Sequence, residues 1–188
     1  ILCLFSFDLL QDQRGVDHAA NKKLVEDREY TQAYIENALI PMVEAVKDHS
    51  ALLAWEIFNE PEGMTREFGW TPVRTTMAAV QQFVNLTAGA IKRVAPHNLV
   101  TNGSWNFRVL TDVDGMHNYY RDDRLIEAGG DPLGVLDFYQ VHYYPVHFNE
   151  ATSPFHRPAS YWQLDKPILI GEFPADGIVR RPGQVFRP

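Results

Sequence analysis

Cysteine is almost absent from this sequence, since Cys3 is the only one in 188 residues. A single cysteine cannot form an internal disulfide, and it carries no information about the cellular compartment. Cys3 lies in an apolar run, where a lone cysteine is typical of a small hydrophobic side chain in a strand. We therefore expect Cys3 to be buried.

Basic residues are also scarce. Lys and Arg number 17 against 24 Asp and Glu, which gives a formal net charge of -7 and a pI near 5.4. Nucleic-acid binding depends on Lys and Arg that neutralise phosphates, so this balance argues against nucleic acid as a partner. No Gly-rich loop joins a predicted strand to a helix N-terminus, which argues against a phosphate or nucleotide site. A neutral substrate fits better.

Long hydrophobic runs are missing too. The apolar opening, residues 1–10, is shorter than the roughly 20 residues that span a bilayer, and no basic residue precedes it. We interpret it as neither a membrane span nor a signal peptide. It lacks an initiator Met and reads as a core strand at the very start, so we expect the chain to be cut from something longer. Composition is that of a soluble globular protein, and its length suits one domain over residues 1–188.

Five apolar runs predict strands, and the stretches between them predict helices. The strands are expected within residues 1–10, 51–58, 98–105, 136–145 and 166–174. Helices are expected at 31–47, despite Pro41, and at 72–94 and 121–128, with a weaker one near 158–164. We expect residues 11–30 and those after 174 to be irregular. Alternating strands and helices predict an α/β fold with a parallel sheet and right-handed crossovers.

Polar residues stand at the C-terminal ends of several of these strands, where a (β/α)8 barrel assembles its active site. A full TIM barrel has eight strands, and about five are found, so the sequence predicts a partial barrel, a single incomplete catalytic domain. Five strands leave two unpaired edges. Because an unpaired edge is a template for association, we expect a homodimer or aggregation of the isolated chain.

Two carboxylates, Glu60 and Glu172, each follow an apolar run at a strand end. Retaining glycoside hydrolysis needs two carboxyl groups about 5–5.5 Å apart, one to protonate the leaving oxygen and one to attack the anomeric carbon. A single Glu at a strand end is usually just solvated. The pair together favours a glycosidase.

Three segments carry a family resemblance: WEIFNEPEG, LDFYQVHYYP and ILIGEFP. At these residues the chain resembles the clan of retaining (β/α)8 glycosidases, and most closely glycoside hydrolase family 5. The resemblance runs in register from the family's third strand to its seventh, so the first, second and eighth would lie outside this sequence. It implies that Glu60 is the acid/base and Glu172 the nucleophile.

The same resemblance implies roles for three neighbouring residues. Asn59 would hydrogen-bond the sugar 2-hydroxyl, His142 would help to bind substrate, and Tyr144 would donate a hydrogen bond to the nucleophile, which favours a charged carboxylate. Alternatively, Asn59 is a turn residue and His142 a core histidine. Side-chain alternation allows only Tyr144, not Tyr143, to share a face with His142.

Two tryptophans receive different interpretations. Trp105 ends a strand, and its apolar ring face would complement the C–H face of a pyranose, although packing is almost as good an explanation. Trp55 lies inside a strand and is expected in the core. The sequons at Asn85 and Asn102 fall in a predicted helix and at a strand end, so we expect both to be chance matches.

No cofactor is expected, and neither is a metal. His142, His147 and His156 are spaced by five and nine residues, which matches no standard zinc pattern, and His117 is isolated.

Two hypotheses about function remain. The first is an enzyme that cleaves a β-1,4-linked polysaccharide of the cellulose or mannan type, with a β-linked oligo- or polysaccharide as its partner and no nucleic acid or membrane. Secretion is then expected, because the substrate is extracellular. The second is a catalytically inactive barrel fragment that only binds sugar or serves a structural or oligomerising role.

Overall fold

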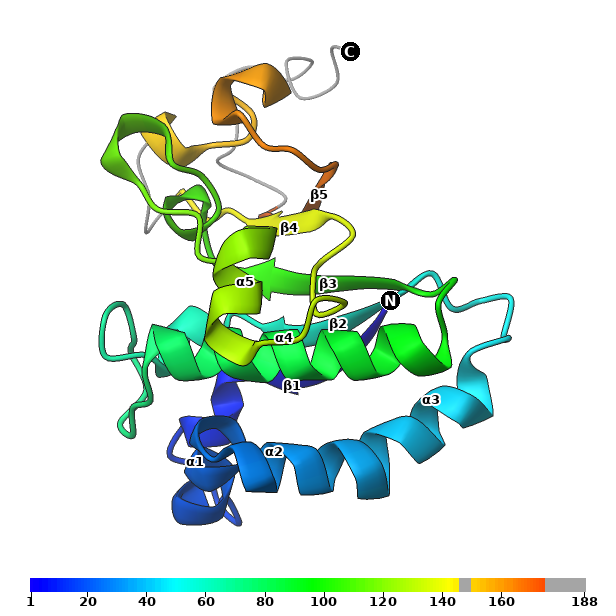
Figure 1. Cartoon of the computed structure of the whole chain (residues 1–188). Coiled ribbons are helices and arrows are strands. Elements are labelled where there is room, and N and C mark those ends of the chain that lie inside the picture. Colours follow the sequence, from blue (N-terminus) through cyan, green and yellow to red (C-terminus); the bar gives the residue numbers. More distant parts are fainter. Residues whose placement is uncertain (146–149, 175–188) are drawn as a thin grey trace.

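A computed structural model describes residues 1–145 and 150–174 of the chain. His147 and the tail predicted to be irregular, residues 175–188, lie outside the described residues. The five strands form one all-parallel sheet in sequential order (Figure 1). They are β1 (Leu2–Ser6), β2 (Ala54–Asn59), β3 (Leu99–Ser104), β4 (Tyr139–His142) and β5 (Ile168–Glu172). The predicted parallel α/β architecture is therefore confirmed.

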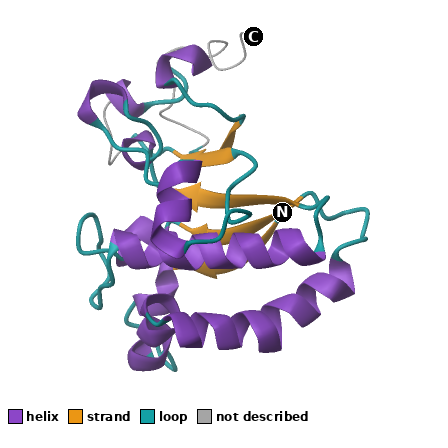
Figure 2. Cartoon of the chain, in the orientation of Figure 1, coloured by secondary structure: helices purple, strands orange, loops and turns teal. Residues whose placement is uncertain are grey.

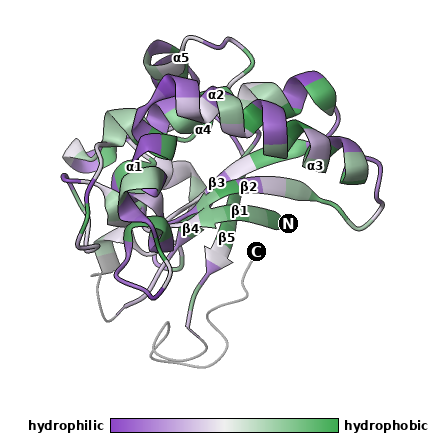
Figure 3. Ribbon diagram, turned by 90° about the horizontal axis from the view of Figure 1, so that it is seen from below, coloured by the Kyte–Doolittle hydropathy of each residue, from purple (hydrophilic) through white to green (hydrophobic). Residues whose placement is uncertain are grey.

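The α-helices gather on one side of the sheet (Figures 2 and 3). They are α1 (His18–Glu26), α2 (Arg28–Tyr34), α3 (Ile40–Val46), α4 (Met77–Val94) and α5 (Asp122–Gly129). Short 3-10 helices occupy Phe7–Leu10, Pro61–Met64, Phe107–Val109, Val113–Gly115, Glu150–Thr152 and Ala159–Trp162. Among the described residues, no helix is long and apolar enough to cross a membrane.

The segment 11–30, predicted to be irregular, is mostly helical. Asp17 accepts hydrogen bonds from the N–H groups of Ala19 and Ala20, which caps the N-terminus of α1. Asp27 ends α1 and caps the first turn of α2. The prediction failed because α1 buries only Val25, so the segment lacks the apolar stripe that identifies a helix in sequence.

The first strand is shorter and more exposed than predicted. After Ser6 the chain turns into a 3-10 helix, and the Ser6 hydroxyl accepts a hydrogen bond from the N–H of Asp8. In the described part of the chain, β1 is an outer strand that pairs only with β2. Leu2 is 44% exposed, and Cys3 is also exposed, so the prediction that Cys3 is buried is wrong for this chain.

Two predicted helices hold with modified ends. The helix at 31–47 does pass Pro41, because a π-helical turn at Ile35–Leu39 joins α2 to α3 and leaves Pro41 in the first turn of α3. The helix predicted from residue 72 begins at Met77, where the Thr76 hydroxyl caps it. The weak helix near 158–164 is reduced to the 3-10 turn Ala159–Trp162.

Aromatic side chains join the helices to the sheet. Phe5 of β1 lies 5.2 Å from Tyr34 of α2 between ring centroids, and Phe58 of β2 lies 5.1 Å from Phe83 of α4. Trp55 is fully buried, as predicted, and its indole N–H donates to the Asn98 side chain at 3.0 Å. This packing fixes the strand positions, and with them the strand ends.

A buried asparagine fastens α4 to the chain that follows α5. The Asn85 amide nitrogen donates to the carbonyls of Asp131 at 2.8 Å and Gly134 at 2.9 Å, and its oxygen accepts from the N–H of Asp131 at 3.0 Å. Asn85 and Asn102 are both fully buried, which agrees with reading their sequons as chance matches.

We predict that Asn85→Ala destabilises the fold by roughly 2–4 kcal/mol, because it removes three buried hydrogen bonds to the backbone of Asp131 and Gly134. The measurement is the free energy of unfolding from urea denaturation. The matched control is Asn37→Ala, since Asn37 is exposed and its side chain donates to the carbonyl of Ala33, one turn earlier in the same helical segment. Equal, small changes in the two variants would contradict the prediction.

Candidate active site

Glu60 follows the last residue of β2 in an unusual backbone conformation. Its φ of 48° and ψ of 51° lie in the left-handed region, which a residue with a Cβ rarely adopts. Its N–H donates to the carbonyl of Gly103 on β3 at 2.6 Å, and Pro61 follows directly. The strand thus ends in a sharp turn that is fixed by the neighbouring strand.

This turn brings Glu60 close to Glu172, the last residue of β5. One oxygen of each carboxylate and a ring nitrogen of His142 all lie within 4.8 Å of one another. Residues far apart in sequence therefore meet, because β2, β4 and β5 end at the same edge of the sheet. The spacing is compatible with the separation of about 5–5.5 Å between carboxyl groups in retaining glycosidases.

His142, the last residue of β4, lies between the two carboxylates. It is 1% exposed, and its Nδ1 lies 2.9 Å from Glu60 Oε1 and 3.6 Å from Glu172 Oε2. Burial lowers the pKa of this imidazole, but the hydrogen bond to Glu60 and the nearby carboxylates outweigh burial and raise it. An Nδ1–H that donates to Glu60 fits this geometry.

Tyr144 lies on the same side as His142. Its hydroxyl donates to Glu172 Oε2 at 2.9 Å, and this bond raises the pKa of Tyr144 to about 12, so the hydroxyl remains a donor. Tyr143 instead packs its ring against Phe155, with centroids 6.0 Å apart. The alternation expected from the sequence is therefore present.

Asn59 and Trp105 line a cavity of about 660 Å³ that also contains both glutamates, a size typical of ligand sites. The other lining residues are Phe7, Trp70, Arg108 and Tyr144. All six predicted site residues thus lie together, since His142 contacts both carboxylates. Trp70 was missed, because it lies far from any strand end in the sequence.

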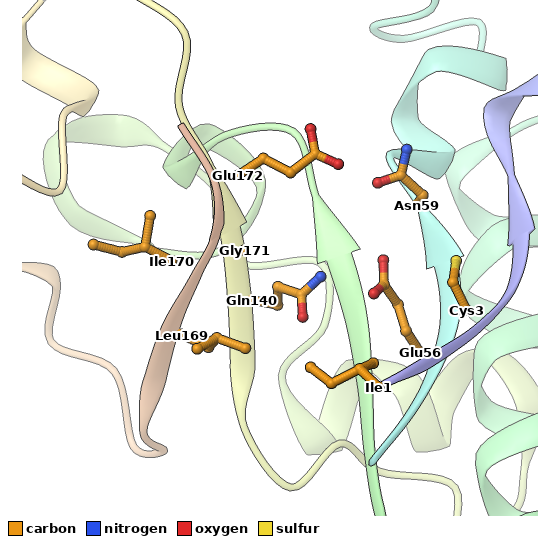
Figure 4. A pocket seen from close by; sticks show the side chains of 9 residues that line it. All are labelled: Ile1, Cys3, Glu56, Asn59, Gln140, Leu169, Ile170, Gly171 and Glu172. Carbon is orange, nitrogen blue, oxygen red and sulfur yellow. The ribbon is translucent and has the colours of Figure 1, made fainter. Parts of the chain in front are cut away.

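A second cavity of about 500 Å³ lies beside the first and shares Asn59 and Glu172 with it. Figure 4 shows Glu56, Gln140 and Cys3 directed into this space. Burial raises the pKa of Glu56. A Cβ at Gly103 would lie 2.4 Å from Glu56 Oε1, so a side chain at this position would displace the Glu56 carboxyl group. Sequence reasoning missed Glu56, because this residue lies inside an apolar run.

Glu62 is a second buried carboxyl group that the sequence reading overlooked. It is fully buried, its Oε1 accepts a hydrogen bond from the Tyr120 hydroxyl, and its Oε2 accepts from the N–H of Trp105 at 3.3 Å. Burial raises its pKa to about 7, although the bond from Tyr120 works in the other direction. Glu62 links the loop that carries Glu60 to the backbone of Trp105.

The cluster of Glu60, His142 and Glu172 also has the ligand types that could hold a metal ion. Sequence spacing did not show this set, because its ligands come from three strand ends. The same atoms are already engaged with one another, since His142 Nδ1 bonds to Glu60. The absence of a metal stays a prediction.

Comparisons with known proteins point in one direction. The family model for cellulase (glycosyl hydrolase family 5) matches residues 14–176. A mannan endo-1,4-beta-mannosidase of Mytilus edulis is 42% identical over an alignment 170 residues long, which covers 80% of this chain and 46% of that protein. Another, from Cryptopygus antarcticus, is 35% identical over 195 residues, covering 92% of this chain and 49% of that protein.

Solved structures agree with the sequence relatives. The beta-mannanase from the blue mussel Mytilus edulis has a TM-score of 0.82 at 39% identity, covering 92% of this chain and 54% of that one. The beta-1,4-mannanase from the sea hare Aplysia kurodai has a TM-score of 0.82 at 37% identity, with the same coverage. The chain spans about half the length of these relatives, and the predicted partial (β/α)8 barrel is confirmed.

We predict that Glu62 makes stability depend on pH. Its pKa of about 7 in the folded protein lies above the ordinary 4.5, so between these values the folded state holds a proton that the unfolded state has released. The free energy of unfolding therefore falls as the pH rises through this window, and the contribution of Glu62 to this fall is on the order of 3 kcal/mol.

Glu62→Gln cannot titrate, so the Tm of the parent minus that of this variant should be highest near the bottom of the window and lower at about pH 8. Calorimetry at several pH values measures it. The matched control is Glu127→Gln, at an exposed position on α5. A difference for Glu62→Gln that stays constant with pH would refute the prediction.

Proposed function

Because this chain belongs to glycosyl hydrolase family 5, we propose that it is the part of a retaining endo-β-1,4-mannanase that carries both catalytic carboxyl groups. The observation that carries the proposal is the meeting of Glu60 and Glu172, with oxygens within 4.8 Å, in a cavity lined by aromatic rings. Two carboxyl groups at this spacing suit double displacement.

In the first step, a carboxylate oxygen of Glu172 attacks the anomeric carbon. The bond from that carbon to the leaving oxygen breaks, and Glu60 gives its proton to the leaving oxygen. In the second step, Glu60 takes a proton from water, whose oxygen attacks the same carbon and releases Glu172. The two inversions retain the β configuration, and Glu60 ends protonated again.

The neighbouring residues support this division of roles. The Tyr144 hydroxyl bonds to Glu172 and orients it for attack. The His142 Nδ1–H holds the Glu60 carboxylate at 2.9 Å, on the side toward Glu172. Asn59 and Trp105 line the same cavity, and in this proposal Asn59 bonds the sugar 2-hydroxyl while Trp105 offers a ring face to the sugar. Such preorganised contacts lower the barrier, because no group has to be reoriented during reaction.

Mannan is the favoured polysaccharide because the similar proteins from Mytilus edulis and Cryptopygus antarcticus are mannan endo-1,4-beta-mannosidases. A glucan is the other candidate that the sequence left open. Since the chain matches about half of each relative, an inactive sugar-binding fragment is the competing proposal.

Two further expectations stay predictions. The proposed polysaccharide substrate is extracellular, so we propose that the protein is secreted. β1 and β5 are the outer strands of the described sheet, which is the basis for the proposed homodimer. A monodisperse monomer in light scattering would contradict the dimer.

We predict that Glu60→Ala and Glu172→Ala each lower reducing-sugar release from soluble mannan by about 10³-fold or more, because each removes a group that takes part in bond breaking. The parent should act on mannan in preference to carboxymethyl cellulose. The matched control is Glu127→Ala, an exposed position on α5, which should retain the parent's rate.

Added azide distinguishes the nucleophile from the acid/base when each variant acts on a dinitrophenyl β-mannobioside. In Glu172→Ala, azide takes the vacated space, attacks the anomeric carbon directly and gives the α-azide. In Glu60→Ala, azide displaces Glu172 from the glycosyl intermediate and gives the β-azide. The opposite pattern would reverse the roles, and a folded parent without activity would support the inactive fragment.

A further inference from the structure

Trp70 is a large apolar side chain that stays 41% exposed within the proposed catalytic cavity. It belongs to the loop between β2 and α4, ten residues after Glu60. A single exposed apolar side chain is common, but Trp70 lines a cavity beside two other aromatic rings, and an apolar cluster of this kind commonly contacts a ligand. Its position therefore calls for an explanation beyond folding.

The loop holds Trp70 in one place. The Trp70 N–H donates to the carbonyl of Gly63 at 2.9 Å, and the Gly69 N–H donates to the carbonyl of Thr65 at 2.9 Å. The Thr65 hydroxyl in turn donates to the carbonyl of Glu62 at 2.8 Å. Because these bonds fix the backbone on both sides of the ring, the indole is ordered before any ligand arrives.

Two glycines make this arrangement possible. A Cβ at Gly63 would lie 2.5 Å from the Trp70 ring, so the indole rests directly on the backbone of the loop. A Cβ at Gly69 would lie 2.3 Å from the carbonyl oxygen of Thr65. Side chains at either position would displace the ring from the cavity.

Trp70 is the middle member of an aromatic track, defined as Phe7, Trp70 and Trp105. Its ring centroid lies 5.3 Å from that of Phe7 and 5.8 Å from that of Trp105. All three rings line the cavity that holds both glutamates. They come from the segments that follow β1, β2 and β3, whereas Glu172 ends β5, which β4 separates from β3 in the sheet.

We propose that Trp70, together with Trp105, binds the sugar unit on the leaving-group side of the scissile bond. The inference rests on the proposed function, in which Glu60 protonates the leaving oxygen. We assign Trp70 to the leaving-group side because it shares a loop with Glu60, the residue that protonates the leaving oxygen in the proposed mechanism. An indole face complements the C–H face of a pyranose, and burying that contact contributes affinity.

The effect should depend on what occupies the leaving-group side. We expect Trp70→Ala to lower kcat/KM on β-1,4-mannohexaose about tenfold, mainly through KM, because one apolar ring face loses its contact. Cleavage of the hexaose should also shift along the chain. On β-mannobiosyl fluoride, which has fluoride in place of the leaving sugar, kcat/KM should stay within about twofold of the parent's.

Three further variants exclude a purely structural role. Trp70→Phe keeps an aromatic face and should recover part of the lost activity on the hexaose. Tyr30→Ala removes an aromatic side chain that is 48% exposed on α2 and should change neither substrate's kinetics. Thermal denaturation of each variant shows whether the fold is intact.

Equal losses on both substrates would overturn the inference, as would unchanged kinetics on the hexaose. If the parent hydrolyses no mannan, the proposed function fails separately. Calorimetry of mannohexaose binding to Glu172→Ala, with and without Trp70→Ala, then decides the inference. About tenfold weaker binding supports Trp70 as a sugar contact, and unchanged binding overturns it.

Discussion

The hydrogen bond between His142 and Glu60 depends on the parallel, sequential order of the sheet, and the rest of the site depends on that bond. His142 is the last residue of β4, and Glu60 directly follows β2. Only β3 separates these two strands, and all three run in parallel and end at one edge of the sheet, so the two side chains can meet. The ladder between β4 and β5 shifts register just before His142, which pairs with Glu172. The irregularity redirects the strand ends at the point where the carboxylates converge.

Unusual backbone and buried charge are concentrated around this edge. Glu60 adopts a left-handed conformation, and Glu56 and Glu62 are carboxyl groups whose pKa values are raised by burial. Such features lower stability on their own and persist only where surrounding packing fixes them. The aromatic and aliphatic core between the sheet and α4 supplies that packing. The residues that stabilise the fold are therefore different from the residues at the strand ends that are suited to chemistry.

Sequence reasoning succeeded where one interaction dominates. Continuous apolar runs located all five strands, and the stripe of α4 and the passage through Pro41 were foreseen. It failed at α1, which buries a single valine and is specified by the Asp17 cap, and at β1, where Ser6 ends the strand early. Local hydrogen bonds decided those places, and hydrophobic periodicity does not report them.

The sequence by itself predicted the fold class, and its family resemblance named the two carboxylates together with Asn59, His142 and Tyr144, because a motif at a strand end can be recognised without knowledge of distances. Only the tertiary structure decided that Glu56 and Glu62 are buried carboxyl groups and that Trp70 lies beside Glu60 and Trp105. The physical reason is that burial and ring contacts arise between segments remote in sequence. The packing of strands and loops creates them, and no local pattern encodes them.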